Sequence, residues 1–214
     1  MSSGFDYSRL KESKIYDTLR PLGKVITKSF YKIEYVGTEN IPADGGIILA
    51  SNHIHALDPL IIAMGMDNRQ LHFMAKKELY ENPVVAKLFT MVNAFPVSRG
   101  LSDKNAIEYA VRVVKEGYVL GIFPEGTRSR NCKPARAKSG VAAIAKAAQA
   151  DIVPVAVIST DNLKKHTKYT VRFGKPIKYE ELGLNDESTR DDVRAAAAFV
   201  MDKIKALWEE GHCK

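Results

Sequence analysis

The sequence contains little cysteine. Its two cysteines, Cys132 and Cys213, are too few for the disulfide framework that stabilises small secreted domains. The first residues carry neither a basic stretch nor an apolar run, so no secretory signal is expected. Both observations favour a protein of the reducing cytosol.

The sequence also lacks an uninterrupted apolar run long enough to cross a bilayer. Its most apolar stretch, residues 45–66, is interrupted by polar residues whose desolvation in hydrocarbon would be costly, namely Asn52, His53, His55 and Asp58. We therefore expect no membrane-spanning helix.

The composition is that of one soluble domain with a surplus of positive charge. The chain has 214 residues, of which 45% are hydrophobic and 27% charged, which excludes a disordered chain. Lys and Arg number 32 against 25 Asp and Glu, a net charge of +7. This surplus predicts an anionic partner: nucleic acid, an acidic membrane surface or a phosphorylated small molecule. No nucleic-acid motif accompanies the charge, so nucleic acid is not expected.

Apolar runs typical of buried strands alternate with helical patterns along most of the chain. The runs lie at residues 33–36, 46–50, 71–75, 118–123, 152–158 and 169–173. Helical patterns between and after them begin behind Ser102, behind Ser139 and near Ser188, the last ending at Gly211. The alternation predicts a single-domain α/β fold over residues 33–214, with a mixed, largely parallel β-sheet flanked by helices.

The first 32 residues carry an amphipathic helical pattern. Apolar residues recur every three or four positions, at Ile15, Leu19, Leu22, Ile26, Phe30 and Ile33. Because proline is tolerated only in the first turn of a helix, two helices meeting at Pro21 are expected. The pattern fits a helical pair packed on the core as well as an element that associates with a membrane surface.

A polar segment, residues 51–59, follows directly on a strand pattern, at the place where α/β sheets bind ligands. A short loop could return the carboxylate of Asp58 to the ring of His53, five residues earlier. Such a carboxylate fixes the tautomer of the imidazole and leaves the other ring nitrogen as a general base. The simpler interpretation is that Asp58 caps a helix ahead of Pro59, and the two roles are compatible.

His53 and His55 also form a His-x-His pair of the kind that zinc hydrolases use. The other histidines, His72, His166 and His212, stand at no ligand-like spacing. A metal site is therefore not expected, and His55 is better interpreted as a hydrogen-bonded loop or core histidine.

A second polar segment, residues 123–130, follows another strand pattern. It places Glu125, the conformationally permissive Gly126 and the guanidinium of Arg128 in one loop that suits a phosphate. The spacing approaches that of a nucleotide-binding P-loop, but Thr127 stands where that motif needs lysine. The simpler interpretation is a polar turn with an ion pair between Glu125 and Arg128.

In this order the segments resemble the four blocks of the glycerolipid acyltransferase family. The blocks are Asn52-His53-x-x-x-x-Asp58, Phe95-Pro96-Val97-Ser98-Arg99, Phe123-Pro124-Glu125-Gly126-Thr127-Arg128-Ser129 and Ile152-Val153-Pro154-Val155. The resemblance covers residues 34–176 and is closest to the bacterial 1-acyl-sn-glycerol-3-phosphate acyltransferases. The first and third blocks together are the specific ones.

The resemblance implies an enzyme that transfers a fatty acyl group from acyl-CoA or acyl-carrier protein to the sn-2 hydroxyl of 1-acyl-sn-glycerol-3-phosphate (lysophosphatidic acid), giving phosphatidic acid. His53, oriented by Asp58, would be the general base, and neither a cofactor nor a metal is implied. Glycerol-3-phosphate or another lyso-lipid as acceptor is an alternative. More distant alternatives are a His-x-His metal-dependent hydrolase and a non-catalytic basic membrane-binding module.

The family's substrate-binding positions fall on Arg99, Glu125, Gly126, Thr127, Arg128 and Pro154. The arginines would bind the acceptor phosphate, the Glu-Gly pair would position the substrate, and the proline of the fourth block would line the acyl or acceptor pocket. Similar bacterial enzymes rest a two-helix N-terminal element in one leaflet, and residues 1–32 fit that role. The implied location is cytoplasmic, with peripheral attachment to the anionic inner face of the cell membrane.

Overall fold

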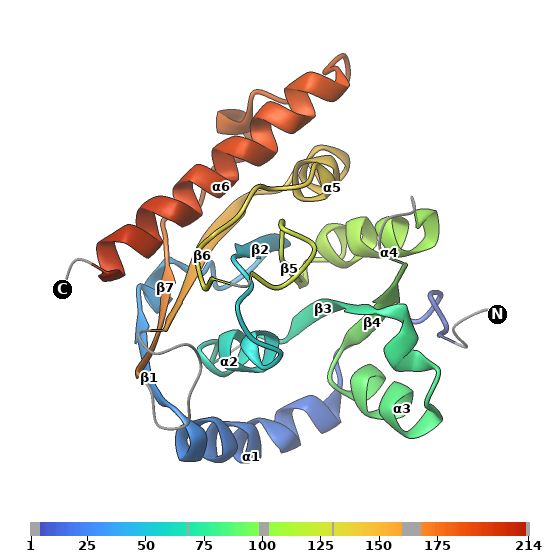
Figure 1. Ribbon diagram of the computed structural model, residues 1–214. Helices are drawn as coiled ribbons and strands as arrows, with labels where there is room; N and C mark the ends of the chain where they lie inside the picture. Colours follow the sequence, from blue (N-terminus) through green and yellow to red (C-terminus); the bar gives the residue numbers. More distant parts are fainter. Residues whose placement is uncertain (1–4, 68, 99–102, 130, 160–167, 213–214) are drawn as a thin grey trace.

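The computed structural model describes residues 5–67, 69–98, 103–129, 131–159 and 168–212. Within these ranges seven strands form one sheet: β1 (Lys32–Val36), β2 (Ile47–Ser51), β3 (Leu71–Lys76), β4 (Ala94–Val97), β5 (Val119–Ile122), β6 (Ile152–Ser159) and β7 (Lys168–Phe173). The spatial order is β1-β7-β6-β2-β5-β3-β4, and every pair is parallel except β6 with β7 (Figure 1). The predicted mixed, largely parallel sheet is confirmed.

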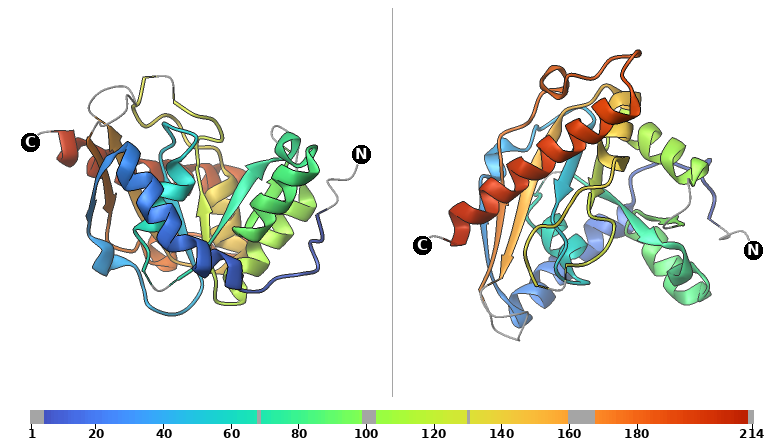
Figure 2. Two further views of the ribbon diagram at one scale, coloured as in Figure 1. Left: turned by 90° about the horizontal axis from the view of Figure 1, so that it is seen from below. Right: turned by 45° about the horizontal axis from the view of Figure 1, so that its top comes forward.

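Helices cover both faces of the sheet (Figure 2). One face packs against α1 (Lys14–Phe30) and α2 (Asp58–Met64). The other packs against α4 (Lys104–Lys115), α5 (Gly140–Ala148) and α6 (Arg190–His212). The helix α3 (Pro83–Met91) lies beside the edge strand β4. Short 3-10 helices span Thr38–Asn40, Lys77–Tyr80 and Tyr179–Leu182.

The sheet separates two apolar cores because successive side chains of a strand point to opposite faces. In β6, Val153, Val155 and Val157 pack with residues of α1 and α2, whereas Ile152 packs with residues of α4, α5 and α6. Every residue of β2, β5 and β6 is buried, as expected for parallel strands covered on both sides. This arrangement fixes which strand residues can reach a site on either face.

One continuous helix replaces the two helices that were expected to meet at Pro21. The side chain of Ser13 caps α1 by accepting the amide of Tyr16 at 3.2 Å, and the helix runs through Pro21 to Phe30. Proline removes one helical hydrogen bond, but contacts hold the helix on both sides of it. Tyr16 is buried before Pro21, and Gly23 lies against Met64 of α2 after it. These contacts outweigh the local preference for a break.

Most of the apolar stripe of α1 faces away from the core. The buried residues of α1 are Tyr16, Gly23 and Thr27, and Gly23 lies against Met64 and Leu60 of α2. The exposed side carries large apolar residues, with exposed fractions of 54% for Leu22 and 61% for Val25. Packing on the core therefore does not account for four residues of this stripe, Ile15, Leu22, Ile26 and Phe30, which are exposed. In the part of the chain that the structure describes, no helix has the length and apolar character needed to cross a membrane.

Two helix starts differ from the sequence pattern. Ser102, the expected cap of α4, lies outside the described residues, and Asp103 caps this helix by accepting the amide of Ala106 at 3.2 Å. Ser139 precedes α5 as expected but forms no side-chain cap bond. The last helix begins at Arg190, near Ser188 as expected.

Candidate active site

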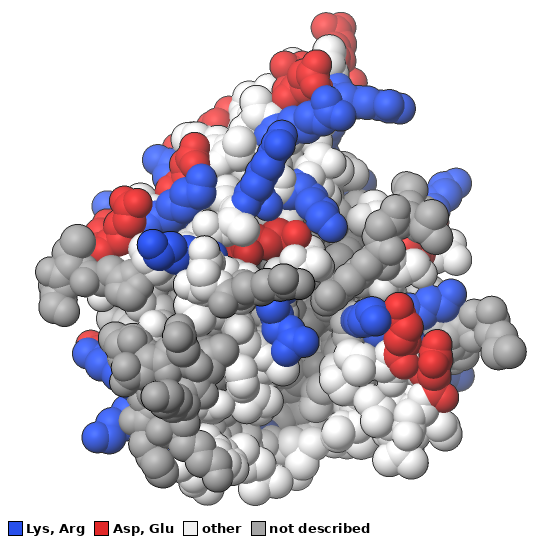
Figure 3. All heavy atoms as spheres, viewed as in Figure 1, with Lys and Arg blue, Asp and Glu red and all other residues white. Residues whose placement is uncertain are grey.

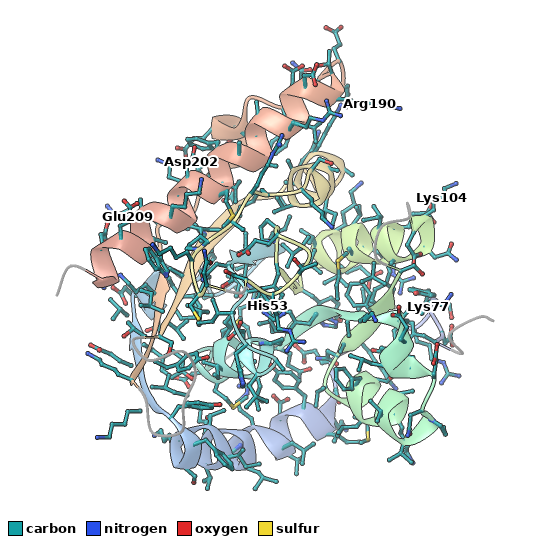
Figure 4. All side chains as sticks on the ribbon, in the orientation of Figure 1. His53, Lys77, Lys104, Arg190, Asp202 and Glu209 are labelled. Atoms are coloured by element: carbon teal, nitrogen blue, oxygen red, sulfur yellow. The ribbon has the colours of Figure 1, made fainter. Side chains whose placement is uncertain are left out.

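The two polar segments leave the same edge of the sheet. The segment around His53 follows β2, and the segment around Glu125 follows β5. Since β2 and β5 are parallel neighbours, their carboxyl ends lie side by side. Figure 4 shows His53 near the middle of the molecule, above α2 in this view. The site is thus built where the central strands end.

His53 and Asp58 form a buried pair. The Nδ1 atom of His53 lies 2.8 Å from Oδ2 of Asp58, and a carboxylate can only accept a hydrogen bond from it. The same oxygen accepts the backbone amides of Ile54 and His55, each at 2.7 Å. Asp58 is fully buried and His53 is 7% exposed. This geometry holds the imidazole with its proton on Nδ1 and leaves Nε2 as the nitrogen that can accept a proton.

Asp58 does not cap α2. It is the first residue of this helix, Leu57 occupies the cap position, and the helix has no side-chain cap bond. The carboxylate instead turns back to the loop, because the amides of Ile54 and His55 and the ring of His53 converge on it. The interpretation of Asp58 as a helix cap is therefore wrong.

An aromatic stack covers one face of the His53 ring. Phe123 lies parallel to this ring with the centroids 4.0 Å apart and the planes 19° apart. Phe73 of β3 stacks on Phe123 in turn, at 5.6 Å and 7°. The stack excludes water from that face of the imidazole. Among the described residues, Nε2 of His53 has no hydrogen-bond partner.

Glu125 joins the two loops. Its Oε1 accepts the backbone amide of His53 at 3.1 Å, and the amide of Ser129 donates to the carbonyl of His53 at 2.7 Å. Burial raises the pKa of Glu125 to about 7 against the opposing effect of the amides of His53 and Ala135, and the charge of Asp58 raises it further. The ion pair expected between Glu125 and Arg128 is not formed, because Glu125 faces inward and Arg128 is exposed.

The rest of this loop turns outward from Glu125. Gly126 has a φ of +72°, which favours glycine, and its amide donates to the carbonyl of Phe123 at 3.0 Å. Thr127 and Arg128 are exposed. In the described ranges Arg128 has neither an ion-pair nor a hydrogen-bond partner, so its guanidinium is available to a ligand. Arg99, the other arginine predicted to bind phosphate, lies outside the described residues.

The structure does not bring Pro154 to His53. The ring of Pro154 lies next to Gly174, together with Leu207 of α6. Its neighbours Val153 and Val155 point to the opposite face of the sheet, toward α2. The strand therefore directs Pro154 to the α6 side, and its part in a substrate pocket stays a prediction.

His55 does not join His53 as a second metal ligand. Its Nδ1 accepts the amide of Leu57 at 3.2 Å, and its ring lies 6.0 Å from that of Tyr31. Across the residues that the structure describes, no three His, Cys, Asp or Glu side chains are grouped as metal ligands would be. The arrangement gives no support to a His-x-His hydrolase.

Two further residues at this site were missed by sequence reasoning. Phe73 supports the stack on His53 from a neighbouring strand, and nothing in its sequence context distinguishes it from an ordinary core residue. Lys138 lies against Gly126 from a position twelve residues further along the chain. The sequence signal for Lys138 is the absence of acidic residues around it.

Comparison with known proteins assigns this fold and site to a class of enzymes. A family model described as Acyltransferase matches residues 32–158, which include both loops and the strands that carry them. The chain belongs to the acyltransferase family and is an enzyme of that class. The predicted family is confirmed.

The names of individual relatives are more specific than the description of the family. The chain is 34% identical over 157 residues to the 1-acyl-sn-glycerol-3-phosphate acyltransferase of Bacillus subtilis, an alignment that covers 72% of this chain and 78% of the relative. It is 35% identical over 182 residues to the enzyme of the same name from Streptococcus pneumoniae, covering 82% of this chain and 66% of that relative.

A solved structure extends the fold assignment to nearly the whole chain. The crystal structure of the 1-acyl-sn-glycerophosphate acyltransferase of Thermotoga maritima aligns with a TM-score of 0.74. The alignment covers 93% of this chain and 80% of that one at 24% identity. At this level of identity, the likeness bears on the fold alone.

Proposed function

We propose that this acyltransferase moves a fatty acyl group from a thioester to the sn-2 hydroxyl of 1-acyl-sn-glycerol-3-phosphate, giving phosphatidic acid. The observation that carries the proposal is the His53–Asp58 pair, in which Nε2 of His53 accepts no hydrogen bond from a described residue, in a chain whose relatives are named for this reaction. Acyl-CoA or acyl-carrier protein serves as co-substrate, and the reaction needs no further cofactor.

The pair acts as a general base. Nε2 of His53 takes the proton of the acceptor hydroxyl while the hydroxyl oxygen attacks the thioester carbonyl, and the carboxylate of Asp58 stabilises the imidazolium that forms. The carbon–sulfur bond then breaks, and the departing sulfur takes the proton from His53. A thiol with a pKa of about 8.5 is a good leaving group, so no strong acid is needed on the donor side. General base catalysis of this kind contributes about 10²- to 10⁴-fold.

The loop after β5 positions the acceptor. Arg128, with Arg99 beyond the described residues, binds the phosphate and so converts the encounter into a near-intramolecular reaction. Gly126 and Thr127 shape the turn that presents Arg128. Glu125 holds the backbone of His53 in place.

Attachment to the anionic inner face of the cell membrane belongs to the same proposal. Leu22 and Val25 of α1 are exposed, and so are Val84 (77%) and Leu88 of α3. Figure 1 shows α1 and α3 along the same lower side of the molecule. An apolar side of this kind suits a bilayer surface, where the lipid acceptor resides.

The reaction is tested by thiol release. Acyl-CoA and acyl-carrier protein are offered as donors, with 1-acyl-sn-glycerol-3-phosphate and glycerol-3-phosphate as separate acceptors. The first acceptor should turn over faster, and the His53→Ala variant should lose at least about 100-fold in kcat. The matched control is His55→Asn, whose side-chain oxygen can still accept the amide of Leu57 and which should retain most of the activity. A wild-type protein inactive with every pair contradicts the proposal.

The membrane attachment is tested by flotation with vesicles that contain an anionic phospholipid. The double variant Leu22→Ser, Val25→Ser should lose most vesicle binding while it retains turnover of a detergent-dispersed acceptor. His53→Ala should show the converse, with binding kept and turnover lost. Binding that survives the double variant rules out this side of α1 as the attachment site.

A further inference from the structure

The loop after Glu125 carries much of the surplus positive charge of the chain. The 13 residues from Gly126 to Lys138 include five Lys or Arg residues and no Asp or Glu, against a net charge of +7 for the whole chain. The next acidic residue along the chain is Asp151. Figure 3 shows Lys and Arg side chains in the upper middle of the front face, with acidic side chains beside them. Charges of one sign at this spacing repel one another and favour binding of an anion.

Hydrogen bonds fix the loop relative to the catalytic pair. The amide of Lys138 donates to the carbonyl of Pro124 at 2.8 Å, and the amide of Ser129 donates to the carbonyl of His53 at 2.7 Å. Within the loop, the side-chain oxygen of Asn131 accepts a hydrogen bond of 2.8 Å from the hydroxyl of Ser129. The two ends of this segment, at Ser129 and at Lys138, are therefore tied to the backbone of His53 and of Pro124.

Lys138 lies across the active-site turn. A Cβ atom built on Gly126 would be 3.0 Å from the Nζ of Lys138 and 3.2 Å from its Cδ and Cε. The stem of Lys138 thus runs along Gly126, which stands between Glu125 and Arg128 in the chain. The missing side chain of Gly126 makes room for it. This contact places the ammonium group of Lys138 beside Gly126. Gly126 directly follows Glu125, which accepts the amide of His53.

Neither cation at this turn is neutralised by the protein. Lys138 and Arg128 are exposed, and neither forms an ion pair within the portion of the chain that the structure describes. The adjacent carboxylate, that of Glu125, is buried and accepts the amides of His53 and Ala135. Both positive charges are available to a ligand.

A phosphomonoester matches this pair of cations. It carries close to two negative charges at pH 7. In a glycerol phosphate the reacting hydroxyl and the phosphate stand on neighbouring carbons, so the phosphate must lie near the general base. A guanidinium offers two parallel hydrogen bonds to it, and an ammonium adds a compact point charge. The turn at Gly126 supplies one group of each kind.

We propose that Lys138 binds the acceptor phosphate together with Arg128 and so sets the preference for a phosphorylated acceptor. The proposal rests on the proposed function and adds one residue to its site. Phosphate is also present on the acyl donor, so the test separates the two sources by measuring KM for donor and acceptor independently.

The test uses Lys138→Met, which keeps the stem along Gly126 and removes the charge. The KM for 1-acyl-sn-glycerol-3-phosphate should rise at least tenfold, while kcat and the KM for the acyl donor change less than about threefold. The preference for this acceptor over the same 1-acylglycerol without phosphate should fall at least tenfold. Lys138→Arg should restore much of the loss.

The matched control is Lys133→Met, which removes the same charge from another exposed position of the loop. It should leave the acceptor KM unchanged. An unchanged KM in Lys138→Met overturns the proposal, as does a rise confined to the donor or an equal effect of Lys133→Met. Equilibrium binding of 1-acyl-sn-glycerol-3-phosphate to the His53→Ala variant, with and without Lys138→Met, measures the same contact without turnover. A wild-type protein without turnover would therefore contradict the proposed reaction. The binding measurement would then decide separately whether Lys138 contacts the phosphate.

Discussion

The backbone amide of His53 donates a hydrogen bond of 3.1 Å to the buried carboxylate of Glu125, 72 residues further along the chain. The ring of His53 contacts Asp58, and the backbone carbonyl of His53 accepts the amide of Ser129. His53 is thus held by its side chain from one loop and by its main chain from another. The orientation of His53 therefore depends on both loops.

The charge of Asp58 can be tested separately from its volume. Asn at position 58 keeps an oxygen for the amides of Ile54 and His55 but cannot stabilise an imidazolium as an anion does. We expect Asp58→Asn to lower kcat by about 10²- to 10⁴-fold. The NH2 group of Asn would take the position of the buried Oδ1 of Asp58, which has no partner among the described residues, and its unpaired donors would cost about 1–3 kcal/mol in stability.

The measurement for Asp58→Asn is kcat with the acyl thioester and the lyso-lipid, below the melting temperature of the variant. Asp67→Asn is the control, because Asp67 is an exposed carboxylate paired with Lys24 at 2.6 Å. It should have no effect on kcat. Retention of more than a tenth of the wild-type kcat in Asp58→Asn would show that the carboxylate is not needed for the base.

Most of the fold could be predicted because long apolar runs with turn signals between them leave few alternatives. Six of the seven described strands match predicted runs to within about two residues. The missed strand, Ala94–Val97, has four residues and contains Pro96, and it lies at the edge of the sheet where proline is tolerated. The break expected at Pro21 was wrong for a different reason, because tertiary contacts of α1 preserved a helix that the local preference of proline would interrupt.

The site was predictable where its geometry is local. The spacing of His53 and Asp58 permits a loop that closes on itself, and the structure contains that loop. The partner of Glu125 was not predictable, since the sequence offers Arg128 three residues away and gives no sign of an amide 72 residues distant. The side of the strand that carries Pro154 was not predictable, because a motif does not reveal which face of a strand each residue occupies.

Burial of Glu125 makes stability depend on pH. Its pKa is raised to about 7 from an ordinary value of 4.5, so the folded protein keeps a proton that the unfolded chain has already released. The stabilisation is therefore complete below about pH 4.5 and is lost as the pH rises through 7. One pKa unit corresponds to about 1.4 kcal/mol, and partial solvation reduces the effect, so we expect a loss of about 1 kcal/mol or more.

Urea unfolding at pH 5 and at pH 8 measures this loss for the wild type and for Glu125→Gln. The variant cannot ionise at this position, so the stability of the wild type relative to it should decrease between the two pH values. Glu187→Gln, at an exposed position, should show no such change. Equal pH dependence of the wild type and Glu125→Gln would mean that Glu125 titrates as an ordinary surface carboxylate.

The contact between Gly126 and Lys138 can be tested from the glycine side. Gly126 and Gly45 have similar positive φ values, +72° and +77°, so alanine is strained at both positions by about 1–2 kcal/mol. A Cβ at Gly45 meets nothing within 4 Å, whereas a Cβ at Gly126 meets Lys138 at 3.0 Å. Both alanine variants should lose similar stability, but Gly126→Ala alone should displace the ammonium of Lys138 and raise the acceptor KM several-fold.

Thermal unfolding and steady-state kinetics of the two alanine variants separate strain from displacement. Adding Lys138→Met to Gly126→Ala should raise the acceptor KM little further, because the two changes act on one contact. If Gly45→Ala raises the acceptor KM as much as Gly126→Ala does, the effect comes from backbone strain in general. The ammonium laid across Gly126 would then have no specific part in binding the phosphate.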